Sequence, residues 1–134
     1  MEKTIFKYAL TAVAGAFFLF SAAAFSLAAE NITAKELKAM LDSKEKVVLI
    51  DVRTPEEHRE AHIPGSILMP LDTLQSVTSL PEGGKRVIYC RSGKRSLKAV
   101  EILSAKGFKD LANLEGGINA WMSIGGQVVT GRGR

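Results

Sequence analysis

Residues 90–96, with the sequence CRSGKRS, are the part of this chain best suited to covalent chemistry. Cys90 is the only cysteine among 134 residues, and Arg91, Lys94 and Arg95 follow it closely. The nucleophilic form of cysteine is the thiolate, which nearby cations stabilise. The segment therefore predicts a reactive thiolate that attracts anionic reactants; the alternative is a buried cysteine with only a packing role.

A strand, a loop and a helix are expected to position this cysteine. Residues 86–90, RVIYC, are typical of a buried strand, and residues 94–106 have the apolar spacing of a helix. The backbone N–H groups of residues 91–96 can form an anion-binding concavity at the positive end of that helix. Ligands of parallel sheets bind at the carboxyl ends of the strands, so we expect the thiol at the rim of the sheet and not in the core.

The number of residues in the loop separates the reactions that such a cysteine can perform. Tyrosine phosphatases, and the arsenate reductases built like them, need an arginine at the sixth position after the cysteine. Here that position is Ser96, and Arg95 comes one residue early, so the loop is too small for phosphate. A nucleotide-binding P-loop is excluded as well, because Ile88 stands where its first glycine belongs.

His58 and His62 are the other candidates for chemistry, since they are four residues apart. A zinc protease helix needs the order His-Glu-x-x-His, whereas this segment reads HREAH. Pro64 is expected to end the helix close to His62. We therefore predict no metal site, with His58 exposed and His62 packed in the turn before Pro64.

Strand-like and helix-like segments alternate along the rest of the chain. Short apolar runs predict five strands, at residues 47–51, 66–69, 86–90, 111–114 and 127–130. Helical spacing predicts helices at residues 33–41, 54–62, 72–80, 94–106 and 116–123. This alternation indicates one α/β domain over residues 30–134, with a mostly parallel five-stranded sheet and helices on both faces.

Capping boxes mark two of the helix starts. Thr33 with Glu36 and Thr54 with Glu57 have the spacing at which each side chain bonds the backbone N–H of the other residue. These pairs predict helices that begin directly after the two threonines.

The helix over residues 94–106 is expected to direct Leu97, Val100 and Leu103 inward and to stop at Gly107. Trp121 is expected to pack the last helix on the sheet.

Residues 1–29 have the composition of a secretory signal. Lys3 and Lys7 precede a long apolar stretch, and small residues at its end predict cleavage near Ala28 and Ala29. The alternative is an uncleaved anchor, because the stretch is long enough to span a membrane. We expect an exported protein, most simply a periplasmic one.

The charge balance argues against nucleic acid as a partner. The chain has 18 Lys and Arg against 14 Asp and Glu, and without the leader 16 basic residues face 13 acidic ones. This surplus is too small and too scattered for nucleic-acid binding. Separately, we expect the protein to be a monomer.

Three segments together resemble the rhodanese family of sulfurtransferases. CRSGKR is similar to the six-residue active loop of that family, LIDVRTPEEHREAHIPGSILMPL to its early signature, and LEGGINAW to its late signature. The resemblance covers residues 32–130. Ala61 departs from it, because the family often has glycine before the histidine.

The resemblance implies a single exported rhodanese domain that works without cofactors. Cys90 would take the outer sulfur of a small anionic donor such as thiosulfate, and the persulfide would pass that sulfur to cyanide or a thiol. The cradle for donor and persulfide would consist of Arg91, Ser92, Gly93, Lys94, Arg95 and Ser96. Asp51 and Arg53, at the end of the neighbouring strand, could orient the loop through ion pairs; the alternative is an ordinary ion pair at the end of a strand, without a role at the loop.

Two other functions remain open at this point. Cys90 could serve a slow persulfide relay or redox partner protein that docks with another exported thiol protein, which an apolar patch beside the loop would favour. A phosphatase or arsenate reductase is disfavoured by the length of the loop.

Overall fold

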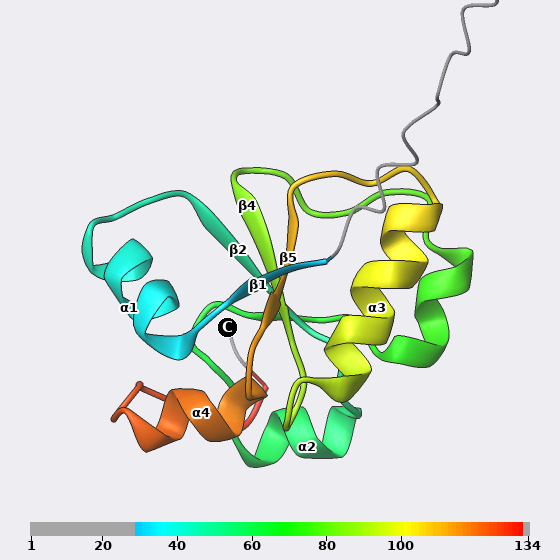
Figure 1. Cartoon of the computed structure of the whole chain (residues 1–134). Helices are drawn as coiled ribbons and strands as arrows, with labels where there is room; N and C mark the ends of the chain where they lie inside the picture. Colours follow the sequence, from blue (N-terminus) through cyan, green and yellow to red (C-terminus); the bar gives the residue numbers. More distant parts are fainter. Residues whose placement is uncertain (1–28, 133–134) are drawn as a thin grey trace, which may run out of the picture.

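The computed structural model describes residues 29–132, and all of the predicted leader except its last residue, Ala29, lies outside these residues. A sheet of five parallel strands runs through the domain in the order β1-β5-β4-β2-β3 (Figure 1). The strands are β1 Glu30–Ile32, β2 Val47–Asp51, β3 Ile67–Leu68, β4 Lys85–Tyr89 and β5 Leu111–Leu114. The helices are α1 Ala34–Asp42, α2 Pro55–Glu60, the 3-10 helix Leu71–Ser76, α3 Lys94–Ala105 and α4 Gly117–Ser123. The predicted α/β class with a five-stranded sheet is confirmed.

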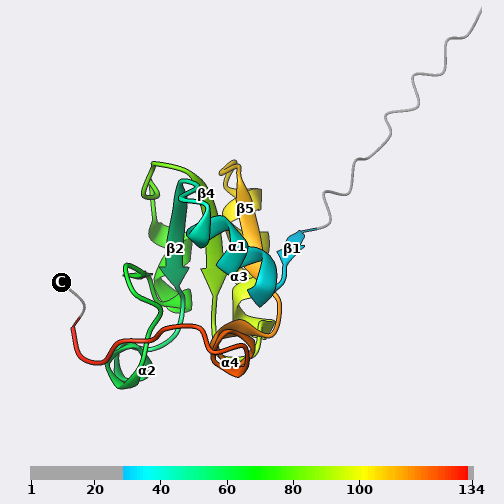
Figure 2. The same cartoon turned by 90° about the vertical axis from the view of Figure 1, so that its left-hand side faces the viewer.

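Helices cover both faces of the sheet (Figures 1 and 2). Successive side chains of a strand point to opposite faces, and β4 shows this alternation. Val87 packs with α1 and α4 on one face, whereas Ile88 packs with α3 and the 3-10 helix on the other. Cys90, two residues beyond Ile88, therefore faces the layer of α3.

Both capping boxes are present. Thr33 and Glu36 bond each other's backbone N–H groups at the start of α1, and Thr54 and Glu57 do the same at the start of α2. These local signals predicted the two helix starts correctly, because a capping box needs only residues three apart.

One of the five strands was predicted at the wrong place. Residues 127–130 form no strand, and in this segment only Val129 makes a bridge, to His62. The fifth strand is instead β1, which pairs with β5. It is three residues long with two exposed side chains, so it has no apolar pattern for sequence reasoning to detect.

The inward face of α3 begins one residue earlier than expected. Leu97 was predicted to point inward, but it is 37% exposed. The buried positions are Ser96, Ala99, Val100 and Leu103. This stripe has helical spacing, with the polar Ser96 as its first member. Trp121 is buried between α4 and the sheet, as predicted.

Among residues 29–132, no helix has the length and apolar character needed to cross a membrane.

Candidate active site

Cys90 lies directly after β4, at the carboxyl edge of the sheet. It is only 1% exposed, so the expectation of a thiol at the rim outside the core is wrong in one respect. The edge is the expected one, but the side chain turns toward α3 and joins the apolar cluster there. The loop that follows covers it, with the Gly93 N–H 3.1 Å from the Cys90 sulfur.

Two glycine positions allow the loop to close over the sulfur. Gly93 has φ +100°, a conformation that favours glycine and directs its N–H back to Cys90. On the other side, a Cβ at Gly117 would lie 2.5 Å from the carbonyl oxygens of both Cys90 and Arg91. The backbone of α4 therefore packs against the loop, and the Ile118 N–H donates to the Cys90 carbonyl at 2.9 Å.

Hydrogen bonds favour the thiolate form of Cys90. Burial raises the pKa of the thiol, but bonds from the Ser96 side chain and from loop N–H groups lower it further than burial raises it. Ser96, Gly93 and Ser92 supply these N–H groups. The resulting pKa lies below the ordinary value, and the predicted concavity of loop amides provides much of the physical cause.

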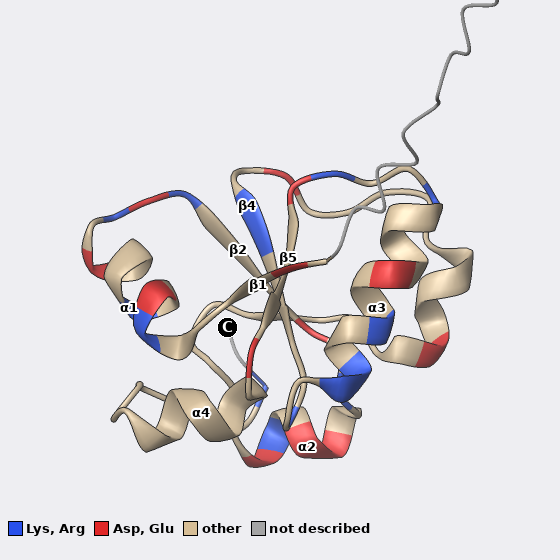
Figure 3. Cartoon of the chain, viewed as in Figure 1, with Lys and Arg blue, Asp and Glu red and all other residues tan. Residues whose placement is uncertain are grey.

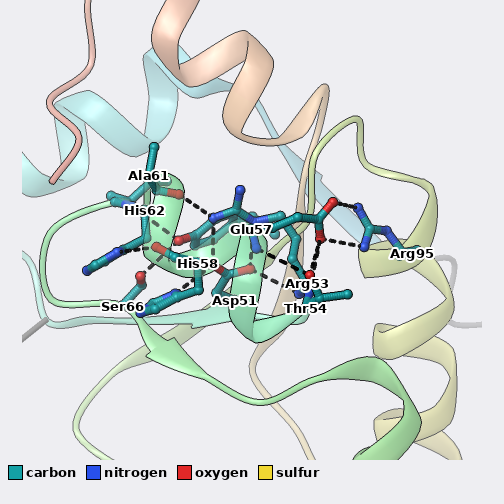
Figure 4. A network of polar contacts seen from close by, with 11 residues as sticks. Asp51, Arg53, Thr54, Glu57, His58, Ala61, His62, Ser66 and Arg95 are labelled. Atoms are coloured by element: carbon teal, nitrogen blue, oxygen red, sulfur yellow. Dashed lines mark hydrogen bonds and ion pairs between the residues drawn. The ribbon is translucent and has the colours of Figure 1, made fainter. Parts of the chain in front are cut away.

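Arg95 does not point freely toward a donor. Its guanidinium makes two bonds to the carboxylate of Glu57 in α2, at 2.8 Å and 2.9 Å (Figure 4). This pairing lowers the pKa of Glu57 to about 2. Glu57 thus ties α3 to α2, a contact between residues 38 positions apart that sequence reasoning missed.

Arg91 and Lys94 are the loop cations that remain available to an anion. Both are exposed, and neither forms an ion pair with another residue in the range 29–132. Basic residues mark the first turn of α3, next to acidic residues of α2 (Figure 3). An approaching anion would therefore meet positive charge on the α3 side of the loop.

Asp51 and Arg53 pair with each other and not with the loop. Arg53 donates to both carboxylate oxygens of Asp51, at 2.9 Å and 2.7 Å, and to the Ala61 carbonyl at 2.6 Å (Figure 4). Asp51 is fully buried, and it also bonds Nδ1 of His58 at 2.8 Å. This pair therefore fixes the connection between β2 and α2. The Arg53 guanidinium also lies over the ring of Tyr89, the residue before Cys90, 5.5 Å from its centroid.

The prediction that His58 is exposed is wrong, because the buried carboxylate of Asp51 holds its ring inside. His62 is buried as expected, with Nδ1 2.7 Å from the His58 carbonyl oxygen and its ring stacked on that of His58. Ala61 has φ −164°, extended backbone that needs no glycine. In the part of the chain that the structure describes, no three His, Cys, Asp or Glu side chains come together as metal ligands.

A small cleft of about 140 Å³ opens beside the loop. It is lined by Arg53, Glu57, Glu60, Ala61, Arg91, Ile118, Asn119 and Met122. Met122 is 44% exposed, so the cleft has an apolar margin on α4.

Comparisons with known proteins agree with this geometry. The Rhodanese-like domain family matches residues 33–124. The chain is 36% identical over 104 residues to a sulfurtransferase of Allochromatium vinosum, covering 77% of this chain and 97% of that one. It is also 42% identical over 94 residues to MoeZ of Mycobacterium tuberculosis, a probable adenylyltransferase/sulfurtransferase. That alignment covers 68% of this chain but only 24% of MoeZ.

Solved structures show the same fold. A rhodanese-related protein of Thermoplasma volcanium superimposes with a TM-score of 0.67 at 33% identity, over 75% of this chain and 97% of that one. A thiosulfate sulfurtransferase of Pseudomonas aeruginosa superimposes with a TM-score of 0.70 at 26% identity, over 79% of this chain and 21% of that one. The chain belongs to the rhodanese-like domain family.

Proposed function

We propose that this protein is a sulfurtransferase that carries sulfane sulfur on Cys90, from a small anionic donor such as thiosulfate to cyanide or a thiol. The observation that carries the proposal is the loop around Cys90, whose Gly93 N–H points at the sulfur. The relative in Allochromatium vinosum is named a sulfurtransferase, and a Saccharomyces cerevisiae relative, 37% identical over 94 residues, is named a thiosulfate:glutathione sulfurtransferase. These names support sulfur transfer as the general reaction.

The proposed reaction has two displacement steps. The Cys90 thiolate attacks the outer sulfur of thiosulfate, the sulfur–sulfur bond of the donor breaks, and its electron pair leaves with sulfite. A persulfide anion remains on Cys90. In the second step the acceptor attacks the outer sulfur of the persulfide, and the electron pair of that bond returns to Cys90. No outside oxidant or reductant is consumed.

The loop supplies electrostatic stabilisation in both steps. Its N–H groups accommodate negative charge on the sulfur, and Arg91 and Lys94 attract the donor and stabilise the departing sulfite. Arg95, which the sequence assigned to donor binding, acts in this proposal through its pairing with Glu57, which holds the loop in shape. The volume of the cleft, about 140 Å³, suits a donor of a few atoms, since pockets for drug-sized ligands have ~300 Å³ or more.

A persulfide relay remains the second candidate. Met122 on α4 and Leu97 on α3 are two of the three large apolar side chains exposed among residues 29–132. Met122 lines the cleft at the loop, which is the kind of apolar contact that a docking thiol protein would use. Slow turnover with thiosulfate and cyanide, together with rapid transfer from a preformed persulfide to a protein thiol, would support the relay over the enzyme.

Turnover of thiosulfate and cyanide to thiocyanate tests the proposal. The wild type should produce thiocyanate, and Cys90→Ser should not. A Cys90→Ser variant that retains wild-type turnover would overturn the assignment.

A further inference from the structure

Hydrogen bonds link the Cys90 sulfur to the edge of the sheet. Ser96 Oγ lies 3.4 Å from the Cys90 sulfur and 2.5 Å from Oδ1 of Asn113 on β5. Nδ2 of Asn113 in turn donates to Oδ1 of Asn31 on β1, at 2.9 Å. Ser96 and Asn113 are buried, whereas Asn31 is exposed. We call these residues, Cys90, Ser96, Asn113 and Asn31, the Cys90 relay.

Asn113 is a polar side chain at a buried position where packing alone would favour an apolar residue. The other residues of β5, Leu111, Ala112 and Leu114, are all buried and apolar. Burying an amide costs free energy unless its hydrogen bonds are made, and an apolar residue would fill this position without that requirement. The position therefore points to a role for the amide itself.

The hydroxyl of Ser96 has one proton and two competing acceptors. A distance of 2.5 Å fits an O–H···O bond but is too short for N–H···O, so Ser96 donates to Asn113. The Cys90 S–H can then donate to Ser96 Oγ, which is the arrangement of the protonated thiol. When the thiolate forms, the Ser96 proton has to turn toward the sulfur.

That turn leaves Oδ1 of Asn113 without its donor. If the Asn113 amide rotates by half a turn, Nδ2 donates to Ser96 Oγ and Oδ1 faces Asn31. The exposed Asn31 amide can rotate as well, so that its Nδ2 donates to Oδ1 of Asn113. Ionisation of Cys90 is thus coupled to the orientation of two amides.

We propose that Asn113 is a positioning residue that, through the single proton of Ser96, sets the balance between the thiol and thiolate forms of Cys90. The proposal deepens the proposed function, because the thiolate is the form that attacks the donor. Asn113 competes for the Ser96 proton in one orientation and releases it to the sulfur in the other.

Charged groups near Cys90 come from other elements than β5. Arg95 and Lys94 lie on α3, Arg91 lies in the loop, and Glu57 on α2 holds Arg95. At the end of β2, Asp51 is ion-paired with Arg53 and hydrogen-bonded to His58. Asn113 is neutral, so its variants change the relay while these charges stay in place.

Ultraviolet absorbance of the thiolate, followed against pH, tests the relay on the full chain. Cys90 is the only cysteine, so no other thiolate contributes to the signal, and ionisation of the two tyrosines is subtracted by the same titration of Cys90→Ser. Asn113→Ala removes the competing acceptor and should lower the midpoint of the Cys90 titration by about one pH unit. At pH values below both midpoints, this is about a tenfold gain in the thiolate fraction. Asn113→Asp is isosteric, always accepts the Ser96 proton and adds a charge, and should raise the midpoint by at least as much. Gln75→Ala changes an exposed amide on the 3-10 helix, outside the relay and the cleft, and should leave the midpoint unchanged.

A Ser96→Ala background separates the relay from the added charge. In that background Asn113→Ala should no longer shift the midpoint of the Cys90 titration. Asn113→Asp should still raise the midpoint, but only by the part of the shift that its added charge causes. The proposal is overturned if folded Asn113→Ala and Asn113→Asp proteins titrate like the wild type, or if both shifts persist in full without Ser96. Uptake of sulfur from thiosulfate is measured separately by mass. If the midpoints move as expected but wild type takes up no sulfur, the proposed function fails and the relay stands.

Discussion

Arg95 and Glu57 form a two-point ion pair that joins the first turn of α3 to α2. The same carboxylate also closes the capping box of α2 with Thr54. One side chain therefore starts a helix and fixes the last arginine of the active loop. Bidentate pairing of this kind holds a planar guanidinium in one orientation, which a single contact does not.

The Glu57–Arg95 pair can be removed without removing the cap, because glutamine also closes a capping box. We expect Glu57→Gln to lower kcat/KM for thiosulfate roughly tenfold through loss of loop geometry, at a stability cost of about 1 kcal/mol. Glu36→Gln changes the equivalent capping box of α1 and is the matched control, because Glu36 forms no ion pair with another residue in the range 29–132. Equal activity of the two variants would contradict the role given to the pair. Steady-state kinetics and thermal unfolding provide the measurements.

The low pKa of Glu57 makes stability depend on pH in acid. In the folded protein this pKa is about 2, below the ordinary value of 4.5, because Arg95 bonds the charged form. The stability from this pair is therefore fully present above pH 4.5 and is lost as pH falls toward 2. Glu57→Gln should flatten the dependence of the urea midpoint on pH in this window. Parallel curves for the variant and the wild type would show that the pair does not titrate in this way.

The two exposed cations of the loop should act on donor binding. Arg91→Ala and Lys94→Ala are each expected to raise KM for thiosulfate about threefold to tenfold with a smaller change in kcat, and added salt should reduce the difference. Lys98→Ala removes an exposed lysine one turn further along α3 and should leave KM unchanged. If all three variants show the same KM as the wild type, donor attraction does not depend on these side chains.

The contact between α4 and the loop can be tested at Gly117. Both Gly117 and Gly125 have positive φ, but an added Cβ meets the Cys90 and Arg91 carbonyls at the first and open space at the second. Gly125→Ala should cost about 1 kcal/mol for backbone strain alone. Gly117→Ala should destabilise more. It should also slow alkylation of Cys90, because a displaced loop no longer directs toward the sulfur the N–H groups that favour the thiolate. Similar unfolding curves and similar alkylation rates for the two variants would argue against this packing.

Local signals predicted part of the structure, and contacts between distant segments were missed. The capping boxes of α1 and α2 and the five-residue spacing from Cys90 to Arg95 depend on neighbours in the sequence, so they could be read directly. Pairing of Arg95 with Glu57, burial of His58 on Asp51 and the bond from Ser96 to Asn113 need elements to meet in space. Nothing near these residues in the sequence distinguishes a paired side chain from a free one.

The role of charge at Cys90 shows the same limit. The sequence places three cations after the cysteine and suggests that they stabilise the thiolate. In the structure the strongest effects that lower its pKa are hydrogen bonds from Ser96 and the loop N–H groups, and one of the cations is engaged by Glu57. Backbone direction decides where N–H groups point, and the sequence specifies it only at special positions such as Gly93.

Intact-protein mass after incubation with thiosulfate tests the central claim most directly. With a single cysteine in the chain, one adduct with the mass of one sulfur atom should form in the wild type, disappear on addition of cyanide or a thiol, and be absent from Cys90→Ser. A wild type that gains no sulfur, or a Cys90→Ser protein that gains the same adduct, would contradict transfer through a Cys90 persulfide.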